Sequence, residues 1–232
     1  SRKVVDRNTR GVAYLLRKNQ VDHIEGTASL KGDGMVEVAP EGRIITGRNI
    51  VIATGARART IPPLPVDGDR VITSREAIVL SELPASIVIV GGGAIGVEFA
   101  YIYRMYGVDV TVVELLPRLV PLEDEVISPI LERSFARQGI KIMTGAGVKG
   151  VQTGPSGVTV TVENHGVEST LDCEKVLVAI GVQPNSEDLG LEAMSIATEA
   201  GRIEIDDSML TNAPSVYAVG DVTGKLALAH AA

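Results

Sequence analysis

The chain has 232 residues, of which 45% are hydrophobic and 25 are glycine, as expected for a globular α/β protein. A formal net charge of −7 and an aromatic content of 3% argue against nucleic acid as a partner. The one cysteine, Cys173, cannot form an intramolecular disulfide, and no apolar run is long enough to span a bilayer. We therefore expect a cytoplasmic protein with no membrane partner, and we assign no metal ligands.

The first third of the chain predicts a helix followed by short strands. The chain starts at Ser1 without an initiator Met, which favours a segment of a longer protein. The periodicity predicts a helix over residues 4–19, and Gly-Asp-Gly at 32–34 predicts a turn. A proline-rich connector and a short helix that starts at Ser74 come next. The predicted strands of this part cover residues 21–26, 35–38 and 44–54.

From Ser86 onward, strands and helices alternate. Continuous apolar runs predict strands that are covered on both faces, and short connections between strands and helices predict a doubly wound parallel sheet. The strands are expected at 87–90, 110–113, 140–143 and 175–180, and the helices at 94–106 and 124–138. Three alternating segments at 148–152, 158–163 and 167–171 predict an antiparallel meander.

A glycine-rich turn joins the first strand of this sheet to its first helix. The segment Gly91-Gly92-Gly93-Ala94-Ile95-Gly96 fits the G-x-G-x-x-G pattern. Gly91 permits the tight turn, Gly93 lets a pyrophosphate approach the backbone, and Gly96 lets the helix pack on the strand. The helix N-terminus offers free N–H groups to phosphates. The alternative is a turn used only for close packing, but the whole unit favours dinucleotide binding.

Two acidic residues follow the glycine-rich turn. Glu114 ends the second strand, where a carboxylate can accept both ribose hydroxyls of adenosine and would repel the 2′-phosphate of NADP. No arginine follows it until Arg118, so the position favours NAD, although a solvated Glu at a strand end is the alternative. Glu98 either complements the helix dipole or faces the nicotinamide half of the ligand, and physics alone leaves both interpretations open.

Two apolar strands remain outside this sheet. Residues 50–54 and 216–219 each lead into a glycine, and neither has a place in the alternation that starts at Ser86. The economical interpretation is a second nucleotide-binding domain, interrupted by the first. We therefore expect a doubly wound Rossmann-like domain at 85–200 inserted into a partial domain at 1–84 and 201–232. Asp221, which follows the last strand, is either a turn residue or a ligand for a hydroxyl.

Four segments carry a resemblance to a known family. "GGGAIGVEFA", "VTVVELLPRLVP", "IGVQPN" and "VYAVGDVTGKLALAHAA" together resemble the pyridine nucleotide–disulfide oxidoreductases. Within that family the chain looks most like the dihydrolipoamide dehydrogenases, the flavoproteins of 2-oxoacid dehydrogenase complexes. The resemblance extends over nearly the whole chain. It implies an NAD domain inserted into an FAD domain that is truncated in this chain.

The resemblance also implies cofactor-binding residues. Asp221 matches the aspartate that holds the FAD ribityl chain, and the segment Ala227, Leu228, Ala229 and His230 matches backbone that lies along the flavin. The further FAD contacts are Gly26, Thr54 and Gly55. The NAD contacts that it implies are Gly91, Gly92, Gly93, Ala94, Ile95, Gly96, Glu98, Glu114, Val148 and Gly181.

The chain departs from the family in its catalytic groups. The redox-active cysteine pair and the His–Glu pair of the family are absent, and the acidic neighbours of Cys173 disfavour its thiolate. We assign no catalytic residue and expect the chain alone to bind NAD without dehydrogenase activity. The longer parent is expected to be a homodimer that acts on the dihydrolipoyl domain of a 2-oxoacid dehydrogenase complex. The alternatives are a related reductase, such as an NADH oxidase or mercuric reductase, and a non-enzymatic NAD-binding module.

Overall fold

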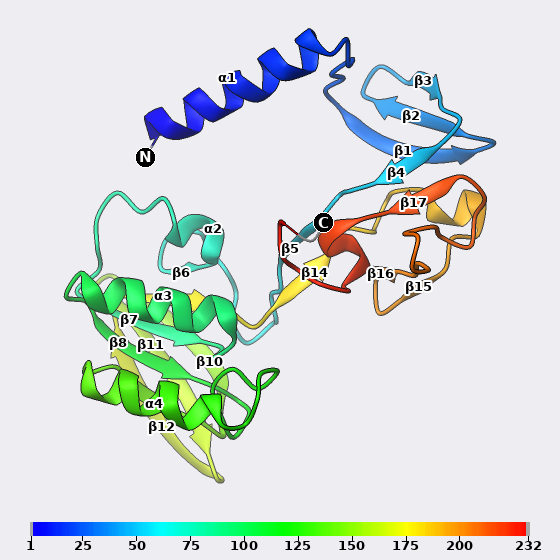
Figure 1. Ribbon diagram of the computed structural model, residues 1–232. Coiled ribbons are helices and arrows are strands. Elements are labelled where there is room, and N and C mark those ends of the chain that lie inside the picture. The colour runs from blue at the N-terminus through cyan, green and yellow to red at the C-terminus, as the bar shows by residue number, and fades with distance from the viewer. Residues whose placement is uncertain (1, 231–232) are drawn as a thin grey trace. The chain divides into compact units, whose positions relative to one another are not determined.

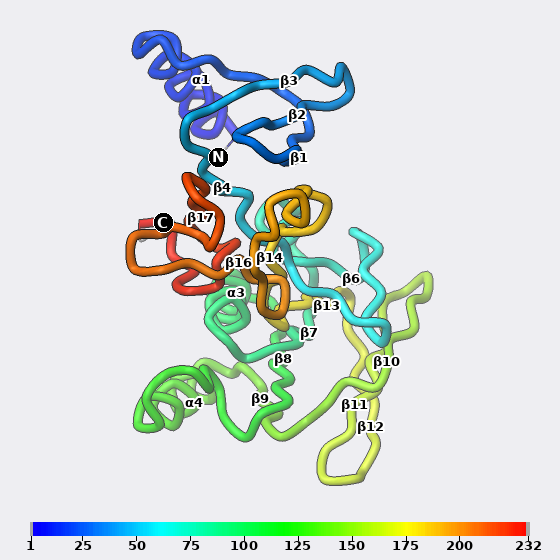
Figure 2. Tube along the Cα trace, turned by 90° about the vertical axis from the view of Figure 1, so that its right-hand side faces the viewer, coloured from blue at the N-terminus to red at the C-terminus, as the bar shows by residue number. Residues whose placement is uncertain are grey.

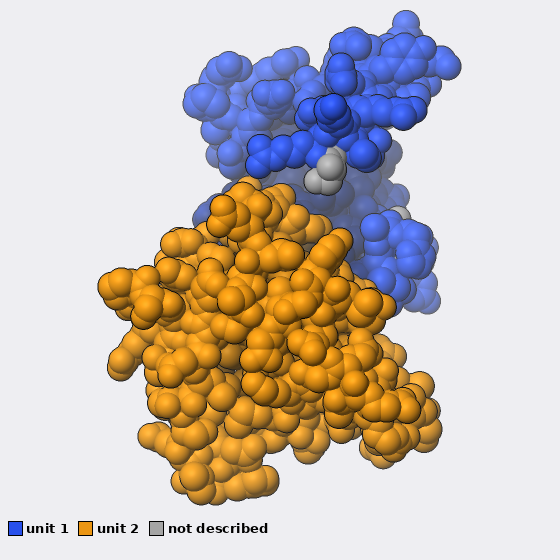
Figure 3. Space-filling view, turned by 90° about the vertical axis from the view of Figure 1, so that its left-hand side faces the viewer, with its two compact units in different colours: residues 1–55, 186–232 blue, residues 56–185 orange. Residues whose placement is uncertain are grey.

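The computed structural model describes residues 2–230 and divides into two compact units (Figure 3). Unit 1 consists of the segments up to Gly55 and from Ser186 onward, and unit 2 is Ala56–Asn185. Unit 2 is thus inserted into the sequence of unit 1. The compact units change over at 55/56 and 185/186, whereas the sequence placed its domain boundaries at 84/85 and 200/201. Which cofactor each unit serves stays a prediction at this point.

A five-stranded parallel sheet forms the centre of unit 2 (Figure 1). The predicted α/β fold with a parallel sheet is confirmed, because every neighbouring pair of these strands is parallel and the two long helices follow β7 and β8 along the chain. The two faces of the sheet are not both covered by helices, as a doubly wound sheet would require. The helices are α3 (Ala94–Met105), after β7, and α4 (Ile127–Arg137), between β8 and β9. The strands run in the order β6 (Val71–Ile72), β13 (Lys175–Val178), β7 (Ser86–Val90), β8 (Asp109–Val113) and β9 (Lys141–Met143).

The two faces of this sheet are covered by different layers. In Figure 2, α3 and α4 lie on one side of the strands, and the antiparallel meander lies on the other. Residues of β7 alternate accordingly: Ile87 and Ile89 join the core on the helix side, whereas Val88 and Val90 join the core beneath the meander. This burial on both faces explains the continuous apolar runs. The meander consists of β10 (Ala146–Gly154), β11 (Gly157–Asn164) and β12 (Val167–Cys173).

Unit 1 contains an antiparallel sheet and a parallel strand pair. The parallel pair joins β4 (Ile50–Ile52) to β17 (Val216–Ala218), so the two strands left over in the sequence lie side by side. The antiparallel sheet has the order β1 (Thr27–Gly32), β2 (Met35–Ala39) and β3 (Arg43–Thr46). The smaller elements are β15 (Thr198–Glu199), β16 (Arg202–Ile203) and the 3-10 helices η1 (Leu191–Met194) and η2 (Gly220–Thr223).

The N-terminal helix α1 (Arg2–Lys18) belongs to unit 1 and has no buried residue. Its apolar side chains are exposed, with Val4 at 60% and Leu15 at 53% of their full accessibility. The helix therefore forms as predicted but buries no apolar face within the described chain. Within residues 2–230, no helix combines the length and the apolar character that crossing a membrane requires.

The structure corrects several boundaries that the sequence suggested. The strand expected at 21–26 is wrong: β1 starts at Thr27, where its pairing with Ala39 of β2 begins, and the next residue after β2 is Pro40, which has no N–H to extend the ladder. A Cβ on Gly26, whose φ is 154°, would also strike the Ala39 carbonyl oxygen. The strand expected at 44–54 is divided into β3 and β4 around Gly47. The helix expected at 124–138 starts at Ile127, since the Asp124 carboxylate turns back to accept from the Val126 N–H at 2.9 Å. The short strands that were missed include β5 (Ala56–Ala58), β6, β14 (Val182–Pro184) and β15.

The short helix α2 (Ser74–Ala77) depends on a capping box and supplies a test of the fold. Glu76 Oε2 accepts from the Thr73 hydroxyl at 2.6 Å and from the Thr73 N–H at 2.9 Å. The hydroxyl bond, helped by the N–H bond and opposed by partial burial, lowers the pKa of Glu76. Because the folded pKa lies below the unfolded one, this stabilisation is present above the unfolded pKa and is lost as pH falls through the folded pKa.

Replacing Glu76 with Gln is expected to lower the free energy of unfolding by about 1 kcal/mol near neutral pH. The difference from the unaltered chain should shrink as the pH falls below the ordinary range of a Glu carboxyl, because the native carboxylate then becomes protonated. Urea unfolding over a series of pH values measures this, with Glu82→Gln on the exposed segment after α2 as the control. A difference that does not change with pH would contradict the capping role of the charge.

Candidate functional site

The glycine-rich turn between β7 and α3 uses its glycines in two ways. Gly91 has a φ of 110°, and a Cβ there would strike the Ala179 carbonyl group. A Cβ on Gly96 would strike the Gly91 carbonyl oxygen, so this glycine allows close helix–strand packing, as the sequence predicted. Gly93 differs, because a Cβ there would meet nothing within 4 Å. The backbone at Gly93 is therefore open to an approaching ligand.

Glu114 follows β8 and is held by two backbone groups. Its side chain is 7% exposed. Oε2 accepts from the Gly92 N–H at 2.5 Å, and Oε1 accepts from the Leu116 N–H at 2.7 Å. These bonds fix the carboxylate between the glycine-rich turn and the segment after β8. Each carboxylate oxygen keeps acceptor capacity beyond the bond that it makes.

Unit 2 contains a cavity of about 650 Å³ next to this turn. This volume lies within the range of small-molecule and cofactor sites. The NAD contacts that the resemblance implies and that line the cavity are Gly91, Gly93, Glu114, Val148 and Gly181. They come from four separate stretches of the chain, so the fold brings distant predicted residues to one place.

The other predicted NAD residues do not line this cavity. Gly92 and Gly96 are buried in the turn and its packing. Ala94 and Ile95 form the start of α3, which has no side-chain cap, so its first N–H groups remain available to solvent or a ligand. Glu98 is exposed on the outside of α3. Its contribution to binding, like the roles of the whole set, stays a prediction.

Several residues that line the cavity were missed from the sequence. Besides Glu114, the only charged residue of the lining is Arg59, whose N–H bonds to the Gly181 carbonyl at 3.0 Å. Arg118, the first arginine after Glu114, is tied to backbone instead, since its guanidinium donates to the carbonyls of Pro121 and Glu123. No local pattern marks the missed positions; the fold alone assembles them. The apolar residues among them are Ile61, Leu64, Val90, Val113, Leu115, Leu116, Pro121, Leu122, Ala146, Ala179 and Ile180.

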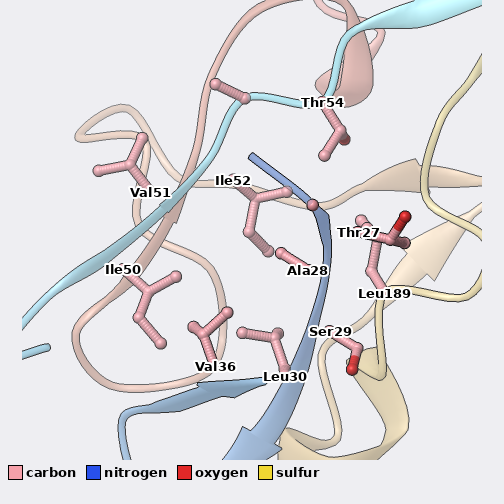
Figure 4. A pocket seen from close by; sticks show the side chains of 12 residues that line it. Thr27, Ala28, Ser29, Leu30, Val36, Ile50, Val51, Ile52, Thr54 and Leu189 are labelled. Carbon is pink, nitrogen blue, oxygen red and sulfur yellow. The ribbon is translucent and has the colours of Figure 1, made fainter. Parts of the chain in front are cut away.

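Unit 1 contains a second cavity, of about 470 Å³, between β1 and the segment of β4 (Figure 4). Gly26 and Thr54, two of the predicted FAD contacts, line it. Figure 4 shows Leu30, Val36 and Ile50 gathered at one end of the cavity and Thr27 and Thr54 at the other. The lining is mostly apolar, and its hydroxyl groups, from Thr27, Ser29 and Thr54, are not confined to one end, because Ser29 lies beside Leu30.

The remaining predicted FAD residues are elsewhere in unit 1. Gly55 has a φ of 66° at the end of the segment after β4. Asp221 is half-buried in η2. The segment from Ala227 to His230 is exposed. The described residues therefore bring two of the predicted FAD contacts, but not the whole set, to one cavity.

The one cysteine of the chain, Cys173, packs in the core beneath the meander. Cys173 is 8% exposed, and burial, with a smaller contribution from the Asp172 charge, raises the pKa of its thiol to about 11. A thiol with this pKa is almost entirely protonated at neutral pH, which fits the expectation that Cys173 is not a redox cysteine. Within residues 2–230, no cluster of His, Cys, Asp and Glu could hold a metal ion.

The chain is similar in sequence to characterised enzymes. It is 44% identical over 236 residues to the dihydrolipoyl dehydrogenase of Chlorobaculum tepidum, a match that covers 100% of this chain and 50% of the relative. The dihydrolipoyl dehydrogenase of Bacillus subtilis is 40% identical, with 99% and 51% covered. The chain therefore spans about half the length of the curated relatives that it matches.

Solved structures and the family comparison agree with the sequence relatives. LpdA from Mycobacterium tuberculosis superposes with a TM-score of 0.90 at 30% identity, which covers 99% of this chain and 52% of LpdA. The HOCl-induced flavoprotein disulfide reductase RclA from Escherichia coli superposes with a TM-score of 0.80 at 31% identity, with 98% and 54% covered. The sequence profile of the pyridine nucleotide-disulphide oxidoreductases matches residues 2–232. The chain belongs to the pyridine nucleotide-disulphide oxidoreductase family.

Proposed function

We propose that this chain is the NAD-binding portion of a dihydrolipoyl dehydrogenase. The observation that carries the proposal is the cavity of unit 2, where the open backbone of Gly93 and the held carboxylate of Glu114 line the same space. The 40–44% identity to dihydrolipoyl dehydrogenases supports the choice within the family.

The residues of the cavity fit a dinucleotide in shape and in charge. Gly93 leaves room for a diphosphate, and the uncapped start of α3 offers N–H groups and a partial positive charge to it. Glu114 accepts the ribose hydroxyls of the adenosine half. Arg118 is engaged with backbone carbonyls, so it is a poor partner for a 2′-phosphate, which favours NAD over NADP.

In this proposal the protein binds and orients, and the cofactor carries the redox chemistry. When bound, NAD supplies a nicotinamide ring that accepts a hydride. The chain's own part is to fix the two ends of the dinucleotide. Glu114 orients the adenosine ribose, and the apolar residues of the lining exclude water from the rest of the ligand.

The second part of the proposal concerns the activity of a longer parent protein, which we infer from the family to which the chain belongs. We propose that the parent is a homodimeric, cytoplasmic flavoprotein that oxidises the dihydrolipoyl domain of a 2-oxoacid dehydrogenase complex. Gly26 and Thr54 would hold part of its FAD from unit 1, with Gly55, Asp221 and the segment from Ala227 to His230 as further proposed contacts. Of these proposed contacts, Gly26 and Thr54 share a cavity in this chain.

The solved structures favour one second candidate. RclA, a flavoprotein disulfide reductase, is as close in sequence to this chain as LpdA is, at 31% and 30% identity. A disulfide reductase with another substrate would use the same NAD cavity. Turnover of the parent with dihydrolipoamide, compared with other dithiols, separates the two candidates.

Replacing Glu114 with Gln tests the NAD site. Gln presents an amide N–H to one of the two backbone donors that the carboxylate now accepts from, and it loses the charge that repels a 2′-phosphate. We expect the Kd for NADH to rise about tenfold or more, while the preference for NADH over NADPH narrows. Titrations followed by nicotinamide fluorescence measure both effects.

The matched control for this titration is Glu168→Gln. Glu168 is exposed in β12 of the same unit and outside the lining, so this variant should bind NADH as the unaltered chain does. Equal binding of NADH and NADPH by the unaltered chain would overturn the role of Glu114. Binding of neither would overturn the NAD proposal itself.

A second prediction concerns the activity of the chain alone. With one cysteine, this chain cannot alternate between a dithiol and an intramolecular disulfide. Purified protein supplied with dihydrolipoamide and NAD should therefore form NADH no faster than buffer does, even with added FAD. Saturable formation of NADH that depends on dihydrolipoamide would contradict this prediction.

A further inference from the structure

A strained turn lies between β8 and α4, and the described function does not account for it. The turn consists of Leu119 and Val120. Val120 has a φ of 42°, a conformation that is unusual for a β-branched residue and that persists only where the surroundings enforce it. Both residues are buried, with Leu119 at 0% and Val120 at 9% exposure.

Two side chains of α4 hold the backbone of this turn. The hydroxyl of Ser128, which is 1% exposed, donates to the Leu119 carbonyl at 2.5 Å. The Leu119 N–H donates to Glu132 Oε1 at 3.2 Å. Ser128 and Glu132 are four positions apart and thus on the same face of the helix. One helix face therefore fixes both backbone groups of a single residue.

The turn at Leu119 and Val120 directly contacts the glycine-rich turn between β7 and α3. The Val120 N–H donates to the Gly92 carbonyl at 2.8 Å. Leu119 Cδ2 lies so close to Gly92 that a Cβ on this glycine would approach it to 2.5 Å. Gly92 is also the residue whose N–H binds Glu114. Ser128 is thus linked to the glycine-rich turn through Leu119 and Val120. Gly92 of that turn extends the link to Glu114.

We propose that Ser128 and Glu132 are positioning residues that set the affinity of the site for NAD through this turn. The inference rests on the proposed NAD-binding function and deepens it. Neither side chain lines the cavity, so neither touches the ligand. They act by holding Gly92 in place, so that its N–H orients the Glu114 carboxylate. The glycine-rich turn then has its binding conformation before the ligand arrives, which lowers the entropic cost of ordering the turn on binding.

Replacing Ser128 with Ala removes the hydroxyl and leaves the Leu119 carbonyl without its donor. We expect the Kd for NADH to rise roughly three- to tenfold, as the loss of one buried hydrogen bond allows. Glu132→Ala provides a second variant with the same direction of change. The matched control is Ser134→Ala, on the same helix, whose hydroxyl accepts from the Gln138 amide and has no link to the turn.

Ser128→Thr separates positioning from mere stability. The threonine keeps the donor but adds a methyl group at a fully buried position, so it should lower the melting temperature. If Ser128 positions the turn, affinity follows the hydroxyl, and the threonine variant binds NADH more tightly than the alanine variant even where it melts lower. If the role is only structural, affinity follows the melting temperature across the series.

Hydrogen exchange of backbone amides provides a second, ligand-free readout. In Ser128→Ala the Val120 amide should exchange faster, while amides of the meander such as Val160 keep their protection. Unchanged exchange at Val120, or equal NADH affinity in the Ser128 and Ser134 variants, overturns the inference and leaves the NAD proposal standing. Failure of the unaltered chain to bind NADH overturns both.

Discussion

The carboxylate of Glu114 is the interaction on which the site of unit 2 depends. It is buried, and each of its oxygens accepts a backbone N–H, one from the glycine-rich turn and one from the segment after β8. A charged group at 7% exposure is stable only where such bonds compensate for lost water. The same bonds fix the spacing between two loops that follow neighbouring parallel strands. The same two hydrogen bonds therefore determine both the position of the carboxylate and the packing of the two loops.

The central sheet of unit 2 could be predicted well from the sequence, because strands that are buried on both faces consist of continuous apolar runs. Ile87 to Val90 had to be a covered strand, and the glycines that follow had to form a turn. Unit 1 was predicted less well. Its strands are short, and β1 begins only where Thr27 pairs with Ala39 of β2, a contact that no local pattern encodes. The short strands β5 and β14 pair with each other although they lie at opposite ends of unit 2 in the sequence, and no local pattern predicts such a pairing.

The residues of the candidate site also fall into two groups: those that a local sequence pattern predicts and those that only the tertiary fold brings together. The glycines of the turn and Glu114 could be named from the sequence, because a dinucleotide-binding βαβ unit needs glycines after its first strand and an acidic residue at the end of its second strand. Arg59, Leu122 and the α4 side chains Ser128 and Glu132 could not, because they reach the cavity or its supports only through the tertiary fold. Family membership is established across residues 2–232, whereas the parent's substrate and partners rest on relatives twice as long as this chain.

Amide chemical shifts during an NADH titration would report which unit binds the dinucleotide. We expect the amides of Gly92, Gly93, Leu116 and Val148 to shift in a saturable manner, whereas those of Gly26 and Gly55 in unit 1 should not shift. Saturable shifts would assign the dinucleotide to the cavity beside Glu114. Shifts confined to unit 1, or no saturable shift anywhere, would contradict the assignment of unit 2 as the NAD-binding unit.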